Sequence, residues 1–153
     1  MKLFLFTLTT LAWALWFGGL ATMFVVTRAT FAHSHELGRT ANPIMFRTFE
    51  PYILVVAGVA VVSSILWLAF SRSRLLKVVC ALLILGGITS AYAHFGVSLR
   101  LQQMSPSTPE WKSLHGRSMM LYAAQAGLLA IGGLLLPATL AQQQKLRVDQ
   151  HAA

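Results

Sequence analysis

Long uncharged stretches dominate the pattern of hydrophobic and polar positions in this chain. Four runs contain no Lys, Arg, Asp or Glu: residues 3–27, 51–71, 78–99 and 118–144. A helix crosses a hydrocarbon core about 30 Å thick with roughly 20 apolar residues, and each run reaches this length. Only a helix can satisfy its own backbone hydrogen bonds in lipid. The pattern therefore predicts an all-α integral membrane four-helix bundle, with residues 1–153 as a single domain.

Composition favours the same fold over a soluble domain with a large buried core. The chain is 56% hydrophobic and 10% charged, whereas soluble domains carry about 25% charged residues. The net charge of +8 would suggest nucleic acid binding in a soluble protein. Here the basic residues lie at the ends of the apolar runs, where they mark topology and contact lipid head groups. We therefore expect the lipid bilayer, and no nucleic acid, as a partner.

The first run could be a cleaved signal peptide or a retained helix. The apolar part of a signal peptide is about 7–15 residues long, and residues 3–27 exceed it. We therefore predict a retained helix and a multi-pass protein of the cell membrane. Four spans place both termini on the side of the loop at residues 72–77, which carries three basic residues and no acid. The positive-inside rule then places both termini in the cytoplasm.

Two helix starts are visible between the runs. Asn42 followed by Pro43 is typical of an N-cap and a first helical residue, as is Thr108 followed by Pro109. The first pair predicts a short amphipathic entry into the second span. The second pair predicts that the last helix begins near Pro109, about two turns before it enters lipid.

Polar residues enter the apolar runs at helical spacing. One face of the third helix carries Ser90, His94 and Ser98. One face of the fourth carries His115, Ser118, Tyr122 and Gln125. Polar groups in lipid usually face the bundle interior. Four of the five histidines fall at the same predicted rim of the bundle, which also carries Glu50 and Arg117.

Three hypotheses account for this rim. In the first, the polar groups are structural, and Glu50 pairs with Arg47 or Arg117. In the second, the rim holds a cofactor: His94 and His115 bind a haem b, or His33 and His35 bind a transition metal, since imidazoles suit Zn, Cu and Fe. In the third, a transport or lipid-binding cavity is lined by the polar positions. These are Glu50, Ser90, Arg117, Ser118, Tyr122 and Gln125.

Several short motifs resemble one family along nearly the whole chain. They are LWFGGL at residues 15–20, the stretch from PIMF to FEPY at 43–52, and LHGRS at 114–118. These motifs resemble the family called domain of unknown function 4149, which includes transmembrane protein 205. The family pattern places Asn seven residues after the His of the third motif, where this chain has Tyr122. The resemblance implies four spans and no established biochemical activity.

A second resemblance is confined to the first helix. The run WFGGL at residues 16–20, followed by Arg28 and His33, is similar to HemJ-type protoporphyrinogen oxidases. That similarity implies a haem-binding membrane oxidoreductase, which we keep as the alternative. The main prediction is a non-enzymatic protein with no cofactor. It would be a structural or accessory subunit that packs with other membrane subunits or with itself, or a protein that binds a small solute or lipid.

Overall fold

The computed structural model shows an all-α four-helix bundle, as the sequence predicts. It describes residues 1–71, 73–106 and 108–152, with side chains described up to residue 144 except at 72, 107 and 143. Arg72 in the basic loop predicted at residues 72–77 therefore lies outside the described residues. The predicted loop is too long, because Ser73 caps a helix that begins at Arg74 and includes Lys77. Four helices are long and apolar enough to cross a membrane. The length and the apolar composition of these helices indicate that the chain is a membrane protein.

Six helical segments make up these spans. They are α1 (Lys2–His33), α2 (His35–Ala69), α3 (Arg74–Ala91), the π-helix η1 (Tyr92–Ser98), α4 (Leu99–Leu101) and α5 (Pro109–Ala152). The segments α3, η1 and α4 follow one another without a break and together form the third span. In the bundle, α1 packs on α2, α2 on α3, α3 on α5, and α5 on α1. Helices α2 and α5 are therefore diagonal neighbours.

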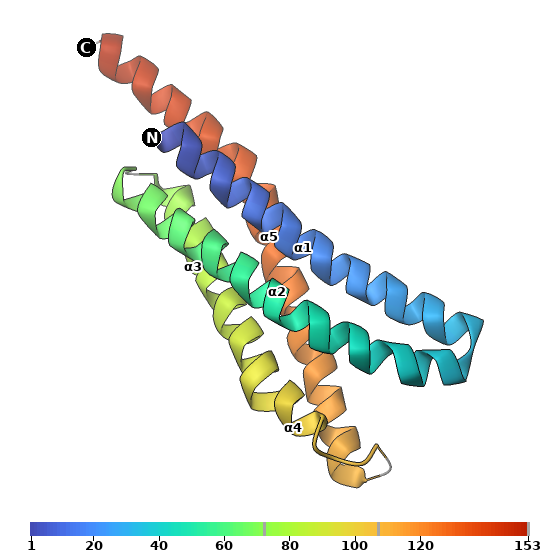
Figure 1. Ribbon diagram of the computed structural model, residues 1–153. Coiled ribbons are helices and arrows are strands. Elements are labelled where there is room, and N and C mark those ends of the chain that lie inside the picture. Colours follow the sequence, from blue (N-terminus) through green and yellow to red (C-terminus); the bar gives the residue numbers. More distant parts are fainter. Residues whose placement is uncertain (72, 107, 153) are drawn as a thin grey trace.

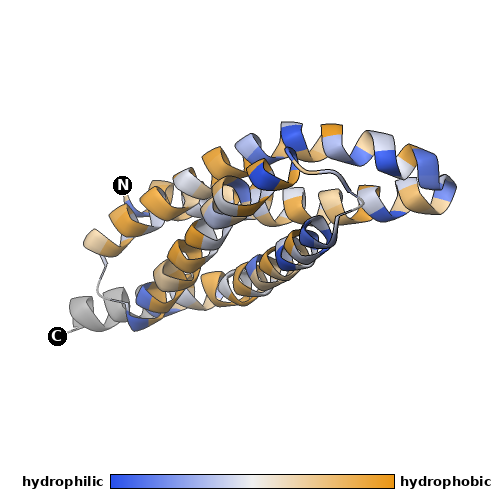
Figure 2. Cartoon of the chain, turned by 90° about the horizontal axis from the view of Figure 1, so that it is seen from below, coloured by the Kyte–Doolittle hydropathy of each residue, from blue (hydrophilic) through white to orange (hydrophobic). Residues whose placement is uncertain are grey.

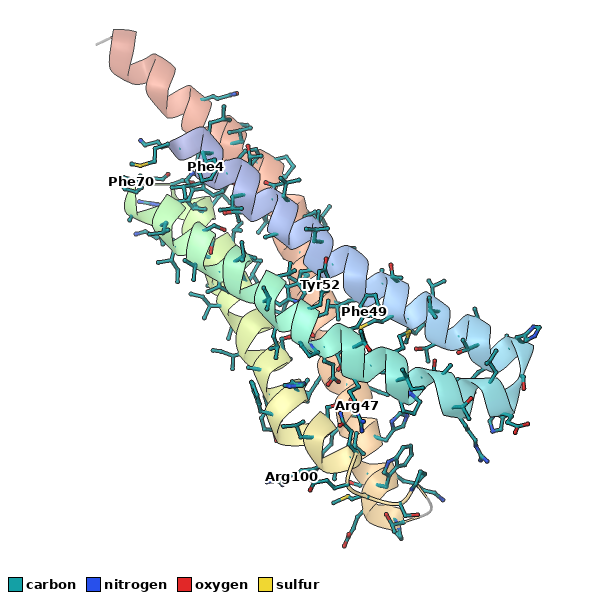
Figure 3. All side chains as sticks on the ribbon, viewed as in Figure 1. Phe4, Arg47, Phe49, Tyr52, Phe70 and Arg100 are labelled. Carbon is teal, nitrogen blue, oxygen red and sulfur yellow. The ribbon has the colours of Figure 1, made fainter. Side chains whose placement is uncertain are left out.

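The bundle is tight at one end and splayed at the other. Figure 1 shows the start of α1 and the end of α5 at the same end as the α2–α3 connection. At the opposite end, the α1–α2 hairpin diverges from α3 and α5. The tip of this hairpin is the most hydrophilic part of the pair in Figure 2. Phe4 and Phe70 lie at the tight end, and Arg47 and Arg100 lie toward the splayed end (Figure 3).

The start of α2 differs from the predicted start at Asn42 and Pro43. The helix begins at His35 and continues through Pro43 and Pro51. Ser34 is its N-cap and accepts a hydrogen bond from the Leu37 backbone N–H. Asn42 instead pairs with α1, because the Thr30 hydroxyl donates to its Oδ1 at 3.0 Å. The Asn-Pro signature therefore marks a contact between two helices here and not a helix start.

The predicted start of the last helix is confirmed. Helix α5 begins at Pro109, and the Thr108 hydroxyl accepts the Trp111 backbone N–H at 3.2 Å. This bond satisfies one of the donors that every helix N-terminus leaves unpaired. The helix continues as one element through the whole fourth span, so it carries the polar face from the rim into the bundle interior.

Candidate functional site

A buried carboxylate joins three of the four spans. Glu50 of α2 is only 5% exposed. Its Oε2 lies 2.9 Å from Nδ1 of His94 in η1, and its Oε1 accepts the Tyr122 hydroxyl of α5 at 2.6 Å. Polar side chains thus connect the diagonal helices α2 and α5 through the centre of the bundle. We call these three residues the Glu50 triad.

The triad borders a small, partly open cavity. Its volume is about 10 Å³, which is room for about one water molecule. Met23 and Ile53 close the cavity from α1 and α2, and Ser90 adds a hydroxyl from α3. The lining consists of Met23, Glu50, Ile53, Ser90, His94 and Tyr122. A carboxylate, an imidazole, a phenol and a hydroxyl therefore converge on one space within an apolar bundle.

The π-helix carries the imidazole into this site. Isolated π-helical turns within longer helices are rare, and they often occur at functional sites. In η1 the buried residues include Ala93 and Val97, while the His94 side chain remains 16% exposed. The ring of Phe95 lies at 4.7 Å from the His94 ring, edge to face. The imidazole is therefore held between an aromatic ring and the Glu50 carboxylate.

The two contacts of Glu50 define the hydrogen bonds that the triad can form. When the carboxylate is ionised it only accepts hydrogen bonds, and the Tyr122 hydroxyl and the Nδ1–H tautomer of His94 then donate to it. In that state both bonds are charge-assisted, and such bonds are roughly twice as strong as neutral ones. Among the described residues, His94 forms the only ion pair with Glu50 when its imidazole is protonated. The arginines that the structural hypothesis paired with Glu50 do not contact it; Arg47 and Arg117 are both exposed.

Other predicted site residues lie apart from the triad. His115 is exposed, and its ring stacks on the Trp111 ring at 4.7 Å with an angle of 11°. Ser118 is buried one turn before Tyr122. Gln125 is buried on the same face of α5 as Tyr122. The spacing in the sequence predicts which helix face carries each of these residues. It does not predict that Glu50 forms hydrogen bonds with both His94 and Tyr122.

The predicted metal pair lies at the tip of the α1–α2 hairpin. His33 is the last residue of α1 and His35 is the first of α2, with Ser34 as the cap between them. Both histidines are exposed, and the His35 ring contacts the Phe31 ring at 5.5 Å. Across the described residues, no group of three His, Cys, Asp or Glu side chains is arranged to hold a metal ion. The hairpin tip also diverges from the helices that carry His94 and His115 (Figure 1).

Replacement of Tyr122 by Phe tests the bond across the bundle. The variant keeps the ring, which packs at 5.9 Å from the Phe46 ring, and removes only the hydroxyl that donates to Glu50. Loss of a hydrogen bond to a charged group costs about 1.5–3 kcal/mol. We expect a lower thermal unfolding midpoint in detergent. The matched control is Tyr92→Phe, since Tyr92 is exposed; an equal drop in both variants would contradict a specific role for Tyr122.

Comparison of the chain with protein-family models, with curated proteins and with solved structures finds no match. The resemblances to domain of unknown function 4149 and to the HemJ-type enzymes therefore stay predictions. The candidate function accordingly depends on the chemistry of the Glu50 triad and its cavity.

Proposed function

We propose that this chain is a non-enzymatic, multi-pass membrane protein that binds a small cationic solute at the Glu50 triad. One observation carries the proposal: the Glu50 carboxylate is 5% exposed within a bundle of four apolar spans. An ionisable group in such a place is expensive and usually marks a solute or ion pathway. A purely structural role would be met at lower cost by apolar packing, since buried ion pairs add little net stability.

The lining of the cavity supports a cation over an anion. Glu50 supplies negative charge, and Ser90 and Tyr122 supply hydroxyl oxygens that are able to accept hydrogen bonds or coordinate a cation. Neither Lys nor Arg lines the cavity among the described residues. Its volume of about 10 Å³ suits a group no larger than water, such as ammonium or an alkali-metal ion. The proposed ligand is therefore a small monovalent cation.

The proposal includes a placement in the cell membrane. The start of α1 and the α2–α3 connection share one end of the bundle (Figure 1). With the positive-inside rule applied to the basic residues at 72–77, of which Arg74 and Lys77 begin α3, both termini are cytoplasmic. The Glu50 triad then lies toward the opposite, splayed end of the bundle. We also propose that the chain belongs to the family called domain of unknown function 4149.

Thermal unfolding of the purified protein tests cation binding. The midpoint is measured in detergent with sodium, potassium, ammonium or methylammonium chloride, with choline chloride as the reference at equal ionic strength. A ligand at 100 times its Kd stabilises the folded state by about 2.7 kcal/mol. For a chain of this size that is roughly a 5–10 °C rise in midpoint. We expect such a rise with at least one cation.

Two variants make this test specific. Glu50→Gln keeps the side-chain shape and removes the charge, so we expect it to lose the cation-dependent rise. Glu36→Gln removes an exposed acid from the same helix and is expected to retain the rise. If every cation shifts the wild type and Glu50→Gln equally, the proposed cation site is wrong.

A haem or metal centre is the second candidate, because of the way Glu50 holds His94. Histidines that bind metals usually donate the other ring nitrogen to a carboxylate or carbonyl, which fixes the ring orientation. The Nδ1 of His94 lies 2.9 Å from Glu50 Oε2, so the Nε2 on the other side of the ring is oriented as a ligand would be. His115 stacks on Trp111 and is exposed, so it would have to move to share one haem with His94.

Absorbance and metal analysis of the purified protein test this candidate. A centre on His94 would give a Soret band or a stoichiometric metal that His94→Ala removes and His115→Ala leaves unchanged. Loss of the signal in both single variants would indicate ligation by both histidines. We expect neither a Soret band nor a stoichiometric metal in the wild-type protein. A stoichiometric signal that depends on His94 would replace the cation proposal with the haem or metal one.

A further inference from the structure

Among the described residues, several buried side chains have one unpaired polar atom, and Gln125 is the one with two. It is 0% exposed, and neither its Oε1 nor its Nε2 has a hydrogen-bond partner among the described residues. Burial of an amide without partners is costly, because water would have satisfied both groups in the unfolded chain. Natural proteins therefore pair nearly all such groups, and an unpaired one calls for a ligand or an ordered water.

In the tight half of the bundle, Trp67 Nε1 and Thr10 Oγ1 are also buried without a partner among the described residues, but other polar side chains there bond one another directly. The Thr9 hydroxyl of α1 donates to Ser63 of α2 at 2.9 Å. The Ser73 hydroxyl donates to Gln142 of α5 at 2.6 Å. These bonds connect different helices directly and leave no need for a further molecule. Gln125 differs because its donor and its acceptor are both unpaired.

The position of Gln125 connects it with the Glu50 cavity. It lies three positions after Tyr122 on the same face of α5, an axial rise of roughly 4.5 Å. Four residues further along, Leu129 packs with Trp16 of α1 against Gly86 of α3. Gln125 therefore lies between the cavity and this packed layer, on the side away from the splayed end.

A second unpaired donor lies in the adjoining layer. Trp16 is also 0% exposed, and its indole Nε1 has no hydrogen-bond partner among the described residues. Buried Trp N–H groups usually find a partner. An amide oxygen, an amide N–H and an indole N–H are thus left unpaired in neighbouring layers of the same core.

We propose that Gln125 and Trp16, which do not themselves line the Glu50 cavity, form an inner site for a water-sized neutral polar molecule that connects with this cavity. This inference rests on the proposed function, since the route to Gln125 begins at the Glu50 triad. The inner site carries no charge, so it suits water, ammonia or a molecule of similar size with both a donor and an acceptor. A cation held at Glu50 would thus have a polar neighbour one helical turn deeper in the bundle.

Silver labelling of single cysteines tests whether water reaches Gln125. Cys80 is the only cysteine, so Cys80→Ala gives a clean background. Ag⁺ is small and charged, so it reaches a thiol through water and not through hydrocarbon. The probed variants in this background are Gln125→Cys, Ser90→Cys in the wall of the Glu50 cavity, and Leu129→Cys. The measurement is the rate at which Ag⁺ labels each thiol. It is obtained from the fraction of thiol protected, after increasing times, from later alkylation in denaturant.

Leu129→Cys is the matched control, because Leu129 is equally buried, lies on the same helix and is truncated by a similar amount. We expect labelling at positions 90 and 125 at least tenfold faster than at position 129. Labelling at 90 with none above the control at 125 would overturn the inner site and leave the Glu50 cavity in place. Labelling at 125 but not at 90 would overturn the connection. No labelling at either position would overturn both proposals.

Gln125→Met gives a second measurement that needs no cysteine. Methionine has nearly the same length but neither donor nor acceptor. A bound polar molecule would lose its main partner, so we expect a lower thermal midpoint than in the wild type. In a dry core the same change would remove two unpaired groups and raise the midpoint. A raised midpoint would therefore contradict the inner site, whatever the labelling shows.

Discussion

Replacement of Glu50 by Ala is expected to destabilise the protein more than any other change of a single polar residue. The substitution removes the acceptor of both the His94 and the Tyr122 hydrogen bonds and leaves their part-buried donors without a partner. A buried polar group that loses its partner costs about 1–3 kcal/mol, so two such groups give about 2–6 kcal/mol. For a chain of this size, each 1 kcal/mol lowers the midpoint by about 2–4 °C.

The comparison of Glu50→Ala with Glu50→Gln separates stability from binding. Glutamine keeps an oxygen that is able to accept one of the two bonds, so we expect it to recover part of the midpoint. It carries no charge, so cation binding should stay absent. Glu36→Ala is the control, since this acid is exposed on the same helix and its loss should change the midpoint little. Equal destabilisation by Glu36→Ala and Glu50→Ala would show that the buried position of Glu50 does not matter.

The four spans could be predicted because charge alone defines them. Charged side chains are excluded from hydrocarbon, so the uncharged runs in the sequence give the number and approximate limits of the spans. The start of α5 was predictable as well, because Thr108 caps it through a local bond to Trp111. The start of α2 was not predictable, because the Asn42 side chain accepts a hydrogen bond from Thr30 of α1 and does not cap its own helix. A cap signature has the same sequence whether its partner is local or distant.

The triad was only partly predictable. Helical spacing placed His94 and Tyr122 on inward faces, but it gives no depth for a residue relative to another helix. Which residues meet depends on the axial register of diagonal helices and on the π-helix η1, and neither leaves a periodic signal in one sequence. The usable signal was Glu50 itself, an acid beside the start of an uncharged run. Its nearest basic residue in sequence is Arg47, one helical turn away, so the sequence alone favours an arginine as its partner.

Replacement of Gly133 by Ala is expected to break the contact between α1 and α5. The Trp13 indole of α1 lies over Gly133 and donates to the backbone oxygen of Leu129 at 2.7 Å. A Cβ at position 133 would fall on the Trp13 ring. Inserted atoms in a packed core cost about 1–3 kcal/mol, and the lost hydrogen bond adds about 1 kcal/mol. The thermal midpoint should fall accordingly, while cation binding at the remote Glu50 triad should persist at low temperature.

Gly127 provides the matched control for this prediction, because the same helix carries it and a Cβ there would meet nothing within 4 Å. Alanine is a better helix former than glycine by about 1 kcal/mol, so Gly127→Ala should leave the midpoint unchanged or raise it. Trp13→Ala should make Gly133→Ala nearly harmless, since the clash requires the indole ring. If the two substitutions are additive in a double-mutant cycle, the ring does not oppose the added methyl group. Helix α1 would then be held on α5 by other contacts.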